Sequence, residues 1–173
     1  DITIPAKVLI DGTYYAVKSI RASAFYDISL NSVTIEDGVE SIETRAFWDS
    51  DGINELKLPS TLKKIGSEAF TWAYITSLDL PEGLVSVGRN AFSSCPKLKK
   101  AILPSTLSEI GNNVFNNCNS LSVIISRIQT PFEINENVFS SNTSVVLYVP
   151  EGTKSEYEKT SGWNSFSSIV EGN

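Results

Sequence analysis

The sequence predicts a right-handed solenoid of the α/β class, in which short parallel strands and short helical turns repeat along one elongated domain. The first observation is a series of six phenylalanines spaced 22 to 24 residues apart, at Phe25, Phe47, Phe70, Phe92, Phe115 and Phe139. The second is a string that recurs at residues 56–70, 78–92 and 101–115, and the third is that no linker interrupts the 173 residues. A leucine-rich string with a fixed period in the twenties is typical of a leucine-rich-repeat solenoid.

The recurring string follows the template apolar-x-apolar-Pro-x-x-Leu-x-x-Ile/Val-Gly-x-x-Ala/Val-Phe. Its first part alternates like a strand, which ends at Pro because Pro cannot donate to a ladder. Gly66, Gly88 and Gly111 are expected to permit a backbone bend. The Ala-Phe pair is expected in a short helical or 3₁₀ turn, and the six rings in one buried column.

Residues 1–173 are expected to form a single domain with three parts. Residues 1–32 hold the first coil and a hairpin cap, residues 33–146 the repeats of 22–24 residues, and residues 147–173 the last strand and a C-terminal cap. Asp11-Gly12 between alternating apolar residues predicts the hairpin, which is expected to fold over the open edge of the first coil. Residues 154–159, Trp163 and Phe166 predict a short amphipathic helix and a tail laid over the final coil.

Strands are expected at residues 2–4, 33–35, 56–58, 78–80, 101–103, 123–125 and 147–149, with the middle residue of each pointing outward. In stack order these outward residues are Thr3, Thr34, Lys57, Asp79, Ile102, Ile124 and Tyr148. Pro follows most of the strands, while Glu36 and Ser126 are expected in its place after two of them.

The candidate protein-binding site on this strand face consists of Lys57, Asp79, Ile102, Ile124 and Tyr148. Its last three members form a contiguous apolar run, and partners usually dock on the sheet face of a solenoid. Two other interpretations stay open. Strand propensity alone favours Ile and Tyr at such positions, and the C-terminal cap could cover them.

An alternative carbohydrate-binding site consists of four aromatic residues near the first phenylalanines: Tyr26, Trp48, Trp72 and Tyr74. Tyr26 and Trp48 follow the phenylalanine in neighbouring coils, and adjacent aromatic platforms can stack on sugar rings. Packing of the same rings between loops is the other interpretation.

Composition argues against catalysis, and the chain is predicted not to be an enzyme and to need no cofactor or metal. It has no histidine, which removes imidazole acid–base chemistry and most transition-metal sites. Its net charge of −6 would repel nucleic acid and anionic lipid, so neither is an expected partner. No run of 18 apolar residues is present, so no membrane insertion of this domain is expected.

Cys95 and Cys118 lie one repeat apart, in the same column of adjacent coils. Adjacent strands are about 4.8 Å apart, which places the Cα atoms within reach of a disulfide. Parallel side chains hold the Cβ atoms slightly too far apart without local bending. Free buried thiols and a disulfide therefore both stay open.

The residues at 56–70, 78–95 and 101–118 resemble the BspA-like leucine-rich repeats, also called the LRR_5 type, and the two cysteines fall on a Cys position of that motif. The resemblance covers nearly the whole chain. It implies a cell-surface or extracellular protein of a host-associated bacterium, often lipid-anchored and linked to adhesion. Since the sequence begins directly in a strand-like segment at Asp1, any anchor is expected outside it.

Taken with this resemblance, the leading hypothesis is a non-catalytic adhesion module that binds a host or microbial surface protein through the strand face. The alternatives are a carbohydrate-binding surface protein that uses the aromatic residues, and a structural spacer.

Overall fold

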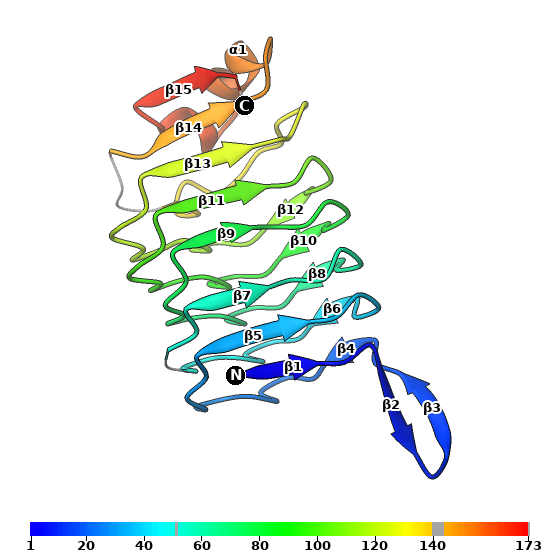
Figure 1. Ribbon diagram of the computed structural model, residues 1–173. Coiled ribbons are helices and arrows are strands. Elements are labelled where there is room, and N and C mark those ends of the chain that lie inside the picture. The colour runs from blue at the N-terminus through cyan, green and yellow to red at the C-terminus, as the bar shows by residue number, and fades with distance from the viewer. Residues whose placement is uncertain (51, 140–143, 173) are drawn as a thin grey trace.

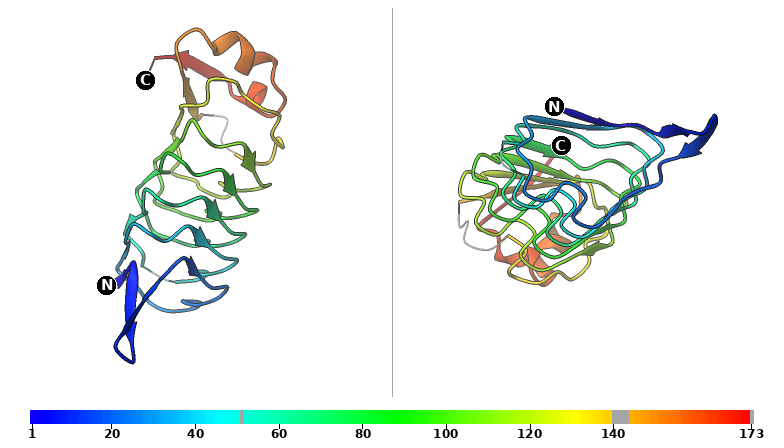
Figure 2. Two further views of the ribbon diagram at one scale, coloured as in Figure 1. Left: turned by 90° about the vertical axis from the view of Figure 1, so that its right-hand side faces the viewer. Right: turned by 90° about the horizontal axis from the view of Figure 1, so that it is seen from below.

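A computed structural model describes residues 1–50, 52–139 and 144–172, and it has the solenoid architecture that the repeat predicts (Figure 1). The coils stack along one axis, with the two termini at opposite ends. Each coil contributes a strand to a long face and, in the first five coils, a second, shorter strand to a short face. Seen along the axis, the coils superimpose around a common interior (Figure 2).

The long face consists of parallel strands in two separate sheets. In stack order the strands are β1 (Ile2–Ile4), β5 (Ser32–Ile35) and β7 (Glu55–Lys57), then β9 (Ser77–Asp79), β11 (Lys100–Leu103), β13 (Val123–Ser126), β14 (Val146–Val149) and β15 (Ser168–Glu171). Side chains alternate along each strand, so that Leu78 and Leu80 enter the core while Asp79 stays in solvent. Strands β7 and β9 are not paired with each other.

The short face is a second parallel ladder that the sequence analysis did not predict. Its strands have two residues each: β4 (Ser19–Ile20), β6 (Ser41–Ile42), β8 (Lys64–Ile65), β10 (Ser86–Val87) and β12 (Glu109–Ile110). The second residue of each is buried against the interior. A two-residue strand carries no alternation pattern, so only the inward Ile or Val was readable from the repeat.

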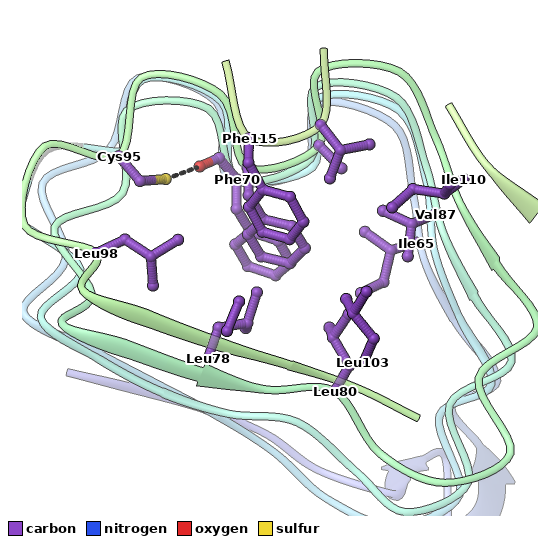
Figure 3. Packing of buried hydrophobic residues seen from close by; sticks show 14 of the residues in the cluster. Ile65, Phe70, Leu78, Leu80, Val87, Cys95, Leu98, Leu103, Ile110 and Phe115 are labelled. Carbon is purple, nitrogen blue, oxygen red and sulfur yellow. Dashed lines mark hydrogen bonds between the residues drawn. The ribbon is translucent and has the colours of Figure 1, made fainter. Parts of the chain in front are cut away.

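The column of phenylalanine rings is confirmed. From Phe25 to Phe139 the neighbouring ring centroids are 5.0, 5.1, 5.4, 6.0 and 5.4 Å apart, and the rings are within 11° of parallel. The rings lie at the centre of the cross-section, between the aliphatic side chains of the two faces (Figure 3). Four of them, Phe47, Phe70, Phe92 and Phe115, are fully buried.

The C-terminal segment closes the far end of this column. Helix α1 (Lys154–Lys159) and the 3₁₀ helix η1 (Trp163–Ser165) bring two fully buried aromatic side chains onto the last coil. The Trp163 ring lies 5.7 Å from that of Phe139, and its Nε1–H donates to the Phe132 carbonyl at 2.8 Å. The predicted helix and tail are present, and β15 adds a parallel strand that the sequence analysis did not anticipate.

The predicted N-terminal hairpin forms, but it does not cover the first coil. Strands β2 (Lys7–Ile10) and β3 (Thr13–Ala16) pair in antiparallel register around Asp11-Gly12. They project away from the solenoid (Figure 1), and every residue of both strands is exposed. The Val17 N–H donates to the Ala6 carbonyl at 2.8 Å, which closes the base of the hairpin beside the coil. We call residues 7–16 the hairpin arm.

The predicted register of the fifth repeat is wrong by one residue. Ile124, expected to point outward, is fully buried, and Ile125 takes the outward position beside Ile102 and Tyr148. The inward partner of Ile124 is Ser126, so the residue at the Pro position of this repeat is Arg127 and not Ser126. A slip of one residue moves every side chain of a strand to the other face.

Candidate functional site

The outward side chains of the long-face strands lie in one row, which we call the strand face. Of the five predicted site residues, Lys57 and Asp79 are exposed, Ile102 and Tyr148 are half-buried in this row, and Ile124 is absent from it because it lies in the core. Ile125 takes the outward position of β13 that was predicted for Ile124. An apolar run is therefore present, and it consists of Ile102, Ile125 and Tyr148.

Two hollows lie side by side on the strand face. The first has a volume of about 470 Å³ and lies between β7 and β9, and the second has about 580 Å³ and lies over Ile102 and Ile125. Both volumes are within the range of about 300–1,000 Å³ typical of binding sites. Glu82 and Arg127 line both hollows and therefore stand at the boundary between them.

Arg127 is the site residue that the sequence analysis missed. Its guanidinium reaches back across β11, with Nη1 3.7 Å from Asp79 Oδ1 and 3.4 Å from Glu82 Oε1. All three side chains are substantially exposed, and such ion pairs contribute only about 0–1 kcal/mol. The guanidinium can therefore exchange these partners for a carboxylate of a bound molecule at little cost. The sequence did contain a signal, because this repeat has no Pro after its strand. The register predicted from the sequence placed Ser126 at the Pro position, and so Arg127 was overlooked.

Ser126, in turn, has a structural role. It is fully buried, and its hydroxyl lies 2.6 Å from the Tyr157 hydroxyl, which donates to the Ile128 carbonyl at 2.8 Å. Burial raises the pKa of Tyr157 to about 12, because the interior disfavours the phenolate. This network joins the sixth coil, which β13 opens, to helix α1.

The four aromatic residues of the alternative site do not form one platform. Tyr26 stacks on Trp48, with centroids 4.9 Å apart and planes 13° from parallel, so each ring covers one face of the other. The Lys97 ammonium lies over the Tyr74 ring, 5.0 Å from the ring centroid, in a cation–π contact. Trp72 is 48% exposed and makes no ring contact with the other three among the described residues.

Trp72 has a backbone conformation that is unusual for a bulky residue. Its φ is 72°, in the left-handed region. The equivalent residues of other coils also have positive φ, and they are Asp27, Asp49, Ser94 and Asn117. Asp and Asn tolerate this region far better than an indole-bearing residue does. An exposed tryptophan is thus kept at a strained position.

Cys95 and Cys118 are buried, and no disulfide joins them. Their Sγ atoms are directed at backbone carbonyls of neighbouring coils, Cys95 at Phe70 O (3.5 Å) and Cys118 at Phe92 O (3.1 Å). A hydrogen bond with Cys118, together with burial, raises the pKa of Cys95 well above its usual value. Both thiols therefore act as small core residues.

Within the described ranges, no group of three or more His, Cys, Asp or Glu side chains is arranged to hold a metal ion. None of the helices described is long and apolar enough to cross a bilayer.

Solved structures of bacterial leucine-rich repeat proteins are similar to this chain. A leucine rich repeat protein of T. pallidum is 23% identical, with a TM-score of 0.68, over 98% of this chain and 68% of its own. PcpA, a pneumococcal vaccine antigen, is 22% identical, with a TM-score of 0.77, over 99% of this chain and 41% of its own. A leucine-rich repeat protein from Bacteroides ovatus is 23% identical, with a TM-score of 0.56, over 86% and 47%. These likenesses show a common fold.

No curated protein matches the chain. The chain spans about two thirds of the T. pallidum protein and less than half of the other two. The BspA type leucine rich repeat region, in contrast, matches six copies over residues 18–146, which include all six phenylalanines of the column. The chain therefore belongs to the BspA type leucine-rich repeat family.

Proposed function

We propose that this module is a non-catalytic, surface-exposed or secreted adhesion domain that binds another protein through its strand face. The observation that carries the proposal is the pair of adjoining hollows on that face, flanked by a half-buried apolar run. The run supplies apolar area, while Lys57, Asp79 and Arg127 supply charges that orient a partner.

The partner that this surface fits is a protein with an apolar anchor next to an acidic group. The anchor would lie over Ile102 and Ile125, in the hollow of about 580 Å³. The acidic group would take over the Arg127 guanidinium from Asp79 and Glu82. Family membership and the vaccine antigen among the similar structures support a location at the cell surface or outside the cell.

The test uses the wild-type domain and a variant with Ile102→Ser and Ile125→Ser, immobilised and exposed to host extracellular-matrix and mucus proteins. Any protein captured by the wild type is purified, and its Kd is measured for both forms. Because an apolar anchor would lose its contact area, the double variant is expected to bind at least about tenfold more weakly, or about 1.4 kcal/mol.

Val85→Ala serves as the matched control. Val85 is also an exposed apolar residue, but it lies outside the strand face, between β9 and β10. It is expected to leave the Kd unchanged. Equal Kd values for the wild type and the double variant would exclude the strand face as the binding surface.

Carbohydrate binding is the second candidate, and the strained, exposed Trp72 is the observation that favours it. Strained backbone positions are retained where function needs them. A panel of host glycans would be titrated while tryptophan fluorescence is followed, with Trp72→Asn as the comparison. A fluorescence change that persists in Trp72→Asn, or none with any glycan, would exclude Trp72 as a sugar platform.

A further inference from the structure

The long face is interrupted at one place, between β7 and β9. Every other neighbouring pair of described long-face strands is joined in parallel register, whereas no backbone hydrogen bond links residues 55–58 to residues 77–80 within the described chain. The two ribbons stand apart in Figure 1, and the hollow of about 470 Å³ is lined by both strands. The coils stay closed elsewhere, since β8 pairs with β10 and the Phe70 and Phe92 rings remain stacked.

Backbone groups from both strands face this gap. The Leu80 N–H donates to Ile102 O in the following coil at 3.1 Å. Because successive residues of a strand present their backbone groups to opposite edges, the N–H and C=O groups of Ser77 and Asp79 point back toward β7. The residues equivalent to Asp79 in later coils, Ile102 and Ile125, are paired with the preceding strand.

The facing edge of β7 is open in the same way. Leu58 occupies the template position of Leu103, whose carbonyl accepts the Arg127 N–H of the next coil at 3.0 Å. By this equivalence, Leu58 and Leu56 direct their backbone groups into the gap. Leu56 and Leu58 are only partly buried, whereas Leu78 and Leu80 on the other side are 3% and 0% exposed. The gap therefore has two unpaired parallel edges and an apolar floor.

We propose that the gap is a slot for an extended peptide, which inserts as an additional strand parallel to β7 and β9 and pairs with both. This deepens the proposed protein-binding function and rests on it. Strand addition supplies affinity through backbone hydrogen bonds and specificity through alternate side chains. Two edges of the same face offer twice the backbone bonds of one.

The side chains around the slot define the chemistry of the peptide. Its inward residues lie over Leu56, Leu58 and Leu80, which already fill the floor, so small apolar side chains fit there. Its central outward residue lies between Lys57 and Asp79. A charged side chain there would be attracted by one of these two residues and repelled by the other. A neutral, β-branched polar residue suits this position. A peptide alternating Thr and Ala or Val meets both conditions.

The first test is amide hydrogen exchange followed by NMR on the ligand-free domain. The Asp79 N–H is expected to exchange at least about a hundredfold faster than those of Ile102 and Ile125, which are paired at the equivalent position of the same face. The Leu58 N–H is expected to exchange faster by the same margin than that of Leu80, its equivalent, which donates to Ile102 O. Equal protection at Asp79 and Ile102 would mean that the slot is closed in solution, and the proposal would be wrong.

The second test adds a capped heptapeptide, Thr-Val-Thr-Ala-Thr-Val-Thr, at millimolar concentration. Slower exchange at Leu58, Ser77 and Asp79 is expected, and the same peptide carrying N-methylalanine at its centre should bind more weakly because it lacks a donor. No binding, or equal binding of both peptides, overturns the proposal.

Asp79→Pro removes the N–H that faces the slot and leaves the bonds to β11 in place, so it should abolish protection by the peptide. Asp79→Ala removes the same carboxylate but keeps the N–H, so it separates the two effects: protection by the neutral peptide should fall far less than in Asp79→Pro. Circular dichroism verifies that both variants fold. The slot can also fail while the strand-face function holds. In that case a captured partner would lose affinity for the Ile102→Ser and Ile125→Ser variant, but its binding would not slow amide exchange at Asp79. The strand-face function would then stand.

Discussion

At the scale of single residues, the glycines of the repeat are needed for space and not for an unusual backbone conformation. None of Gly66, Gly88 and Gly111 is among the glycines with positive φ. A Cβ on Gly88 would instead lie 2.5 Å from Ser67 N and 2.7 Å from Gly66 C of the preceding coil. The expectation that backbone freedom explains these glycines was therefore wrong, because their spacing marks a special position without showing whether a dihedral angle or a close contact makes it special.

Gly88→Ala is expected to destabilise the domain by about 1–3 kcal/mol, since the added methyl group meets backbone that cannot move aside without separating the coils. Urea unfolding followed by circular dichroism measures the change.

Glu43→Ala is the control, because Glu43 occupies the same column in a coil that already accommodates a Cβ. It should cost much less than Gly88→Ala. If the two substitutions cost the same, the close approach of coils at Gly88 does not constrain the residue.

Tyr157 should make the domain less stable in alkali. Its pKa is raised to about 12 by burial, against a usual value near 10. The unfolded chain therefore releases the phenolic proton first, so the contribution is complete below pH of about 10 and is lost as the pH rises toward about 12.

Unfolding free energies at pH 8 and pH 11 would be compared between the wild type and Tyr157→Phe. The wild type is expected to lose more stability than the variant between these pH values, by about 1 kcal/mol. Parallel pH profiles would show that Tyr157 does not titrate differently in the folded domain.

At the scale of elements, the register of the fifth repeat shows where sequence reasoning reaches its limit. The strands could be aligned either as Ile102 with Ile124 or as Ile102 with Ile125, and both agree with a period of 22 to 24 residues. Four consecutive residues, Val123 to Ser126, offer an inward pair in either register. Ser126 goes inside because Tyr157 and Ile128 satisfy its hydroxyl, and that contact involves a helix 31 residues further along the chain.

The hairpin arm was predicted correctly as an element and wrongly as a cap. Local turn chemistry at Asp11-Gly12 is sufficient to specify the hairpin. Where the arm lies depends on tertiary contacts, and it has few, because Tyr14 is 71% exposed and Leu9 is 59% exposed.

Replacing residues 7–16 with a two-glycine turn is expected to change the unfolding free energy by no more than about 0.5 kcal/mol. Ala6 and Val17 are already joined by a backbone hydrogen bond, so the turn introduces no strain. Thermal unfolding of the shortened chain would measure this. A loss of several kcal/mol would show that the arm covers and stabilises the first coil.

At the scale of the whole molecule, one column of rings sets the fold, and the two faces follow from it. The spacing of Phe25 to Phe139 was sufficient to predict the number and order of coils, since each ring needs a neighbour above and below to be buried. The gap between β7 and β9 was not predictable. The strings at residues 56–70 and 78–92 match the template equally well, and nothing local distinguishes an open pair from a closed one.

The most direct test of this account is the free energy of unfolding of Phe70→Ala compared with Phe25→Ala. Phe70 is fully buried between two rings, while Phe25 is partly buried at the open end of the column. The central role of the ring column predicts a loss of about 3–5 kcal/mol for Phe70→Ala and a clearly smaller loss for Phe25→Ala. A loss of less than about 1 kcal/mol for Phe70→Ala, or equal losses at both positions, would contradict it.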